Sequence, residues 1–178
     1  AGIADGVGTG ALGNGGIITF TGGTLQYSAA SAGTDYSARF KNSTGAVAID
    51  TNGQNATFAG VIDSTNTLGL TKSGAGTLTL AGASANTYTG ATAVTGGILA
   101  IANKDALNGT SGITVGTANN SSASLRIDVS NATSTTIGSG KSVTVRGLGS
   151  GNLGALLGKD STSVTWAGGV VIGDLTGA

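Results

Sequence analysis

The feature that most constrains the fold is a short alternating run closed by glycines, which recurs along the chain. Within residues 69–101, the runs 77–80 and 98–101 alternate apolar residues with small or polar ones, and glycines bracket both. Alternation with a period of two is the pattern of a β-strand with one buried face. Glycine supplies the positive φ that a tight corner needs. Strands and corners without an intervening helix predict an all-β chain wound as a β-solenoid.

The composition agrees with this fold and excludes several classes of protein. Of 178 residues, 34 are Gly, and Pro, Cys, Met and His are absent. Thr, Ser and Val are abundant, which disfavours helices and predicts no helical domain. Without Cys there is no disulfide framework. Charged residues are 9% of the chain and the net charge is zero, so nothing attracts phosphate backbones or anionic lipid. We therefore expect no nucleic-acid partner and no direct membrane insertion.

A four-residue word gives the chain its longer repeat. The word is Thr, an aromatic residue, Thr or Ala, then Gly, and its copies lie at 19–22, 57–60, 87–90 and 165–168. Self-similarity at intervals of tens of residues is typical of stacked structural repeats. At ~20–25 residues per coil the chain would make roughly seven to nine coils. No domain boundary is visible, so residues 1–178 are expected to form a single solenoid segment.

The same patterns predict individual strands and the core. Besides 77–80 and 98–101, the expected strands are 24–27, 46–49, 61–62, 91–94, 113–115, 125–129, 142–145, 155–157 and 170–172. The interior column should hold Leu25, Leu78, Leu80, Leu99 and Ile101. The aromatic residues of the four-residue word, Phe20, Phe58, Tyr88 and Trp166, should gather near one corner.

Residues able to perform catalysis are scarce. Without His and Cys, zinc sites and Ser-His-Asp or Cys-His arrangements are excluded. All eight acidic residues are Asp, and no two lie within three positions, so there is no local carboxylate motif for calcium. Stacking could still bring Asp50 and Asp63 together, and glycosidases use two carboxylates ~5–9.5 Å apart. We interpret Lys72-Ser73 as a solvated turn rather than a Ser-Lys dyad. The sequence predicts no catalytic, cofactor-binding or metal-binding residues and no enzymatic activity.

Thr-x-Thr pairs suggest a further alternative. They occur at 19/21, 65/67, 77/79, 87/89 and 133/135. Ranked rows of this kind are found on flat solenoids that bind ice, whereas Thr is also common on the outer face of ordinary half-buried strands. The ice-binding interpretation requires a flat and regular Thr array.

The window 69–101 also resembles the passenger-associated transport repeat of bacterial autotransporters. The matching pieces are Leu70-Thr71-Lys72, the glycine-led segment 74–80, the Asn-Thr-Tyr-Thr-Gly stretch 86–90 and the strand start 96–99. The resemblance implies a right-handed parallel β-solenoid at the bacterial outer surface or outside the cell. It also implies a structural or adhesive role in a stalk, fibre or surface coat. A polysaccharide-acting solenoid enzyme is the main alternative, because fold alone does not decide function.

The ends of the sequence predict self-association. An open coil exposes strand edges and an apolar interior, which repeat proteins normally shield with polar caps. Residues 1–16 are rich in Gly and residues 163–178 contain a core-like strand, so neither segment has the character of a cap. Zero net charge offers little repulsion between copies. We expect further coils or copies as partners, and a surface glycan or host ligand as the external one.

Overall fold

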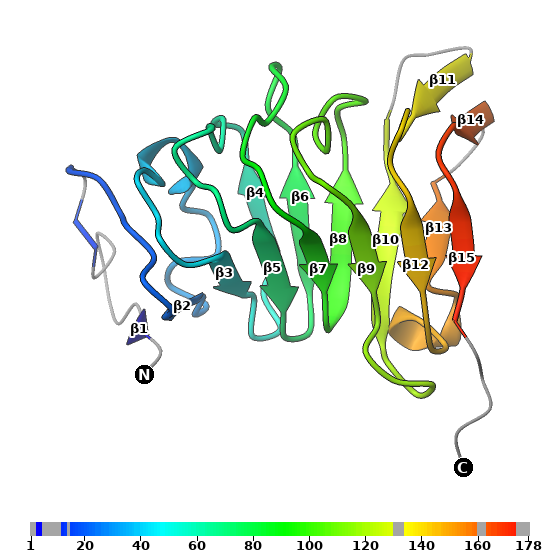
Figure 1. The fold of residues 1–178 in the computed structure, drawn as a ribbon. Coiled ribbons are helices and arrows are strands. Elements are labelled where there is room, and N and C mark those ends of the chain that lie inside the picture. The colour runs from blue at the N-terminus through cyan, green and yellow to red at the C-terminus, as the bar shows by residue number, and fades with distance from the viewer. Residues whose placement is uncertain (1–2, 5–11, 14, 130–133, 160–162, 174–178) are drawn as a thin grey trace.

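The computed structural model describes residues 3–4, 12–13, 15–129, 134–159 and 163–173. Parallel strands stack into two main sheets that face each other (Figure 1). The first sheet contains, in spatial order, β1 (Ile3–Ala4), β2 (Thr24–Gln26), β3 (Val47–Asp50), β5 (Leu70–Ser73), β7 (Thr92–Val94), β9 (Ile113–Val115), β12 (Val143–Val145) and β15 (Val170–Ile172). The second contains β13 (Leu156–Gly158), β10 (Ala123–Ile127), β8 (Gly97–Ile101), β6 (Thr77–Leu80) and β4 (Ala56–Phe58).

A small third sheet and two short turns complete the described elements. The third sheet pairs β11 (Ser134–Ile137) with β14 (Ser163–Trp166). The helical elements of the described residues are two three-residue 3₁₀ turns, η1 (Ser37–Arg39) and η2 (Ser150–Asn152). Every strand pair is parallel, which confirms the predicted all-β solenoid without a helical domain.

The winding is right-handed. In Figure 1 the chain descends through the first sheet, turns at the lower edge, rises through the second sheet behind it and advances from left to right. Six successive turns join β2 to β15, and β1 lies beside β2. The expected seven to nine coils were slightly too many because the last turns are long. Val115 pairs with Val145, 30 residues on, and Val145 pairs with Ile172, 27 residues on.

Most expected strands are present, with boundaries shifted by one or two residues. The segments 113–115 and 170–172 are strands with the expected bounds. Residues 61–62 are not a strand but part of a corner, where the Ile62 carbonyl accepts hydrogen bonds from the amides of Thr87 and Tyr88. Strand β5 was not among the expected strands, and Lys72-Ser73 within it was interpreted as a solvated turn.

Leucines and isoleucines fill the space between the sheets in register. Leu78 pairs with Leu99, and Leu80 pairs with Ile101 on the next strand. All four side chains are at most 1% exposed, and Leu25 is also buried. The predicted interior column is therefore confirmed, and burial of this continuous apolar column is the main stabilising contribution expected for such a stack.

The three phenylalanines of the chain form a row of ring contacts. Phe40 lies between Phe20 and Phe58, with ring centroids 5.2 and 5.5 Å away and edge-on geometry. Tyr88 is buried in a later coil, where its hydroxyl lies 2.6 Å from Thr92 Oγ1. Trp166 packs over Gly138 near the last coils. Phe20, Tyr88 and Trp166 each lie four residues before a strand of the first sheet, which starts at Thr24, Thr92 and Val170 respectively, whereas Phe58 ends β4 of the second sheet.

Candidate functional site

The corner that joins β5 to β6 holds a buried lysine. Lys72 is 0% exposed, and its backbone lies in register between Ile49 and Val94 of the neighbouring coils. The interpretation of Lys72-Ser73 as a solvated turn was therefore wrong. A signal for burial existed in the sequence, since Leu70 and Lys72 are two positions apart on one strand and so share its inner face.

The ammonium group of Lys72 is fully engaged by main-chain carbonyls. Nζ donates to Ser73 O and Gly74 O at 2.8 Å and to Gly96 O at 3.0 Å. Three donors thus meet three acceptors, which compensates the removal of the charge from water. Because Gly96 belongs to the following coil, the lysine links two coils through one side chain.

Burial lowers the pKa of Lys72 from 10.5 to about 8, and the charge of Asp50 opposes this shift. The unfolded chain therefore binds a proton that the folded chain has lost between pH 8 and pH 10.5. The free energy of unfolding should rise with pH in this window, by up to ~1.4 kcal/mol per pH unit. Urea unfolding of the wild type at pH 7, 8, 9 and 10 tests this, with Lys72→Met as the control that should lack the rise.

A second buried group has the opposite effect on stability above pH 10. Burial raises the pKa of Tyr88 from 10.0 to about 12, although its bond with Thr92 lowers it slightly. Above pH 10 the folded chain keeps this phenolic proton while the unfolded chain loses it, so stability should fall again. A wild-type stability that declines steadily from pH 8 to pH 10 would contradict the lowered pKa of the buried Lys72.

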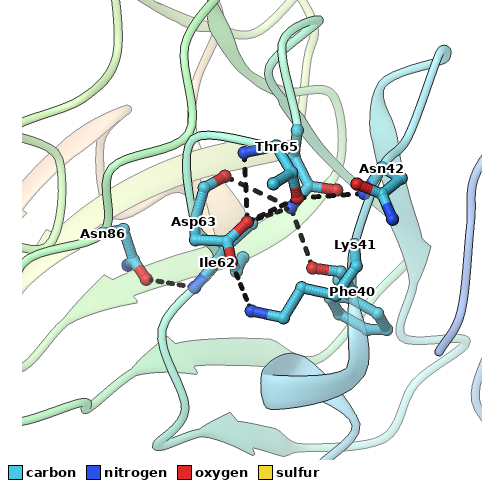
Figure 2. Close-up of polar contacts among 8 residues, drawn as sticks. Phe40, Lys41, Asn42, Ile62, Asp63, Thr65 and Asn86 are labelled. Carbon is cyan, nitrogen blue, oxygen red and sulfur yellow. Dashed lines mark hydrogen bonds and ion pairs between the residues drawn. The ribbon is translucent and has the colours of Figure 1, made fainter. Parts of the chain in front are cut away.

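The two carboxylates considered for catalysis have separate environments. Asp50 accepts hydrogen bonds from Gln26 Nε2 and from the amide of Asn52, both at 2.8 Å. Asp63 forms an ion pair with Lys41 and accepts the hydroxyl of Thr65 at 2.6 Å (Figure 2). Each carboxylate thus supports its own corner, and the described residues contain no group of three or more His, Cys, Asp or Glu that could hold a metal ion.

Asp63 remains ionised in this environment. Partial burial raises its pKa, but the hydrogen bonds from Lys41 and Thr65 lower it, and the net direction is downward. A carboxylate whose pKa is lowered is a poor general acid. The contacts of Asp63 indicate a structural role, because the ion pair with Lys41 links its coil to the preceding one.

Buried asparagines tie the same corner together. Asn86 accepts a hydrogen bond from the amide of Ile62 at 2.9 Å (Figure 2). It also donates to Ala106 O at 3.0 Å, so its side chain links three coils. Asn66 is 0% exposed and donates to Phe40 O of the preceding coil at 2.9 Å. The sequence does not reveal these roles, because asparagines in turns and asparagines in the interior are flanked by similar residues.

The Thr-x-Thr pairs do not form a regular array in the described residues. Thr77 pairs with Ile98 and Thr79 with Ala100 on the next strand, so the row of threonines ends there. Thr133 lies outside the described residues. The flat, ranked surface that ice binding requires is therefore not supported.

The described residues contain no candidate for a membrane-spanning helix. None of their helical segments is long and apolar enough to cross a membrane.

Comparisons with known proteins support the predicted resemblance. Residues 70–101 match the sequence model of a family described as "Passenger-associated-transport-repeat". The chain is similar to "Adhesin BmaC autotransporter" of Brucella suis biovar 1 (strain 1330), with 37% identity over 103 residues. The match covers 57% of this chain but 3% of the relative, so the chain spans only a small part of that protein. No solved structure matches the chain significantly. Residues 70–101, which contain the Lys72 corner, thus match the passenger-associated transport repeat and lie within a right-handed parallel β-solenoid.

Proposed function

We propose that this chain is part of a non-enzymatic, cell-surface β-solenoid of autotransporter-passenger type, with a structural and adhesive role outside the bacterial cell. The observation that carries the proposal is the match of residues 70–101, in the middle of the stack, to the passenger repeat. The similarity to a protein named as an adhesin supports the adhesive part. Stacked parallel strands about 4.8 Å apart form a stiff rod, which suits a stalk or scaffold. Residues 1–178 would form one continuous segment of it.

Surface display and adhesion can be tested together. Antibodies against the chain should label intact bacteria, and external protease should remove the label without lysis. Beads coated with the purified chain should bind host cells or glycan arrays more than beads coated with a charge-matched soluble protein. Label that appears only after permeabilisation would contradict the surface location. Equal binding by both kinds of beads would contradict adhesion by this segment.

The purified chain should show no hydrolase or lyase activity on a panel of polysaccharides. The physical reason is that Asp50 and Asp63 are each committed to corner contacts and are not assembled with a second catalytic group. Release of reducing ends and of unsaturated products measures the two activities. Turnover that disappears in Asp50→Asn or Asp63→Asn would overturn the non-enzymatic assignment.

Self-association with a second copy belongs to the proposal. Val170 and Ile172 continue the columns of Val143 and Val145 but are 49% and 78% exposed. Near the opposite end of the stack, beside β2, an apolar hollow is lined by residues that include Leu12, Ile18 and Leu25. β15 is the edge strand of the first sheet among the described residues, an edge strand offers main-chain groups for further pairing, and zero net charge gives little repulsion. A second copy stacked end to end would cover these surfaces.

Light scattering over a range of concentrations should therefore show growing assemblies of the wild-type chain. Ile172→Asp should reduce the assembly, because it places a charge in the proposed contact. Thr114→Asp, on the outer face of β9, is the control that should leave assembly unchanged. A wild-type chain that stays monomeric at all concentrations would overturn this part of the proposal.

A further inference from the structure

The corner around Lys72 has the construction of a cation-binding site. Three carbonyl oxygens, those of Ser73, Gly74 and Gly96, converge on the ammonium at 2.8–3.0 Å. Converging main-chain carbonyls are a common way for proteins to hold cations. We propose that this corner is a carbonyl cage for a monovalent cation, and that the Lys72 ammonium is its covalently attached occupant.

The cage is shaped by the backbone rather than by the lysine. Gly74 and Gly97 have φ angles of +70° and +63°, a conformation that L side chains rarely adopt. A Cβ atom at Gly97 would lie 2.5 Å from Gly74 O and 2.9 Å from Lys72 Nζ. Glycine at these positions therefore lets the carbonyls face inward and leaves the volume that the cation occupies.

The carbonyls of the cage are not all served by the sheets. Gly74 lies between β5 and β6, and Gly96 lies between β7 and β8, so neither belongs to a strand. A carbonyl in a corner has no place in a sheet ladder and needs another donor or water. Lys72 is a donor to both, which gives the buried ammonium a role that an apolar residue of similar length cannot replace.

The electrostatics of the corner also favour a cation. The Asp50 carboxylate lies against Gly74, since a Cβ there would be 1.9 Å from Asp50 Oδ1. Its charge acts to raise the pKa of Lys72 and so stabilises the ammonium form against the effect of burial. Three successive coils contribute to the cage: Asp50 comes from the first, Ser73 and Gly74 from the second, and Gly96 from the third.

Chemical rescue tests the proposal. Lys72→Ala keeps Cβ and removes Cγ, Cδ, Cε and Nζ, which are the four heavy atoms of n-propylammonium. We expect this variant to melt on the order of 5–10 °C below the wild type, because it leaves a cavity and two carbonyls without their donor. Propylammonium chloride should restore roughly half of the loss in a saturable manner, since a ligand that binds the folded state raises the melting temperature.

The controls separate charge from volume. Sodium chloride at matched ionic strength and neutral 1-propanol should give little rescue, and Lys104→Ala, which removes an exposed lysine, should not respond. Equal rescue by propanol and propylammonium would overturn the cage, because filling volume would then suffice. No stability loss in Lys72→Ala relative to Lys104→Ala would also overturn it.

A measurement on the wild type keeps the proposal testable if the variant does not fold. A lysine-selective ¹⁵N–¹H correlation spectrum at neutral pH should show one slowly exchanging NH₃⁺ group that is lost in a folded Lys72→Met or Lys72→Arg variant. A caged ammonium exchanges slowly because its three protons are held by carbonyls and shielded from water. A wild-type spectrum in which every lysine exchanges rapidly with water would overturn the proposal.

Discussion

Replacing Leu78 by Ala is expected to lower the free energy of unfolding by ~2–5 kcal/mol, because it removes a fully buried side chain and leaves a cavity. Leu78 is 0% exposed, and it is in register with Ala56 on one side and Leu99 on the other. Ala56 is too small to fill the space. Because each coil is stabilised mainly by its neighbours, the loss should also broaden the unfolding transition. Chemical denaturation followed by circular dichroism measures both effects.

Leu68→Ala is the matched control for this prediction. Leu68 is 57% exposed and lies outside the interior column. The same change in chemistry should therefore alter stability by less than about 0.5 kcal/mol. Similar losses for the two variants would contradict the proposed inner and outer faces of the coil.

Replacing Gly97 by Ala should lower the free energy of unfolding by ~2–4 kcal/mol, because the strain of a left-handed backbone and a steric overlap both contribute. Gly97 has a φ of +63°, and its added Cβ would lie 2.4 Å from Gly76 O on the preceding coil. Gly76 directly precedes β6 and Gly97 is the first residue of β8, so neither can move without disturbing the register of the two strands. Thermal and urea unfolding of the variant measure the loss.

The control is Gly33→Ala. A Cβ at Gly33 would meet nothing within 4 Å, and this glycine has no positive φ. This substitution should be neutral or slightly stabilising, because alanine restricts the unfolded chain. A neutral Gly97→Ala would show that the corner is looser than the structure indicates.

The fold could be predicted from the sequence because its physical signals are local and repeated. The alternation in 77–80 and 98–101 selects strands, and the glycines mark corners. Leu78 and Leu99 were assigned to one interior column because strands with the same pattern stack in register, and the structure pairs them directly. The number of coils was predicted less accurately than the strands, since the lengths of the turns after Val115 depend on loops that carry no periodic signal.

The corner residues were harder to predict because their roles depend on neighbouring coils. Lys72 was interpreted as part of a solvated turn, whereas its ammonium is buried and bonded to three carbonyls, one of them 24 residues further along the chain. Asn66 and Asn86 are buried for the same reason, since each bonds to main-chain groups of adjacent coils. A local pattern cannot show which distant carbonyl a polar side chain will meet.

The central claim is that each coil contributes one strand to the first sheet and that these strands stack in order. Electron–electron distances between spin labels on the outer face of this sheet test it. Thr24, Thr114, Thr144 and Val171 lie in one column of paired residues, separated from Thr24 by four, five and six strand spacings. At about 4.8 Å per strand, the backbone separations from position 24 should be about 19, 24 and 29 Å. Label pairs 24/114, 24/144 and 24/171 should therefore give narrow distributions whose means increase in equal steps. Broad distributions, or mean distances that do not increase from 114 to 171, would contradict the solenoid.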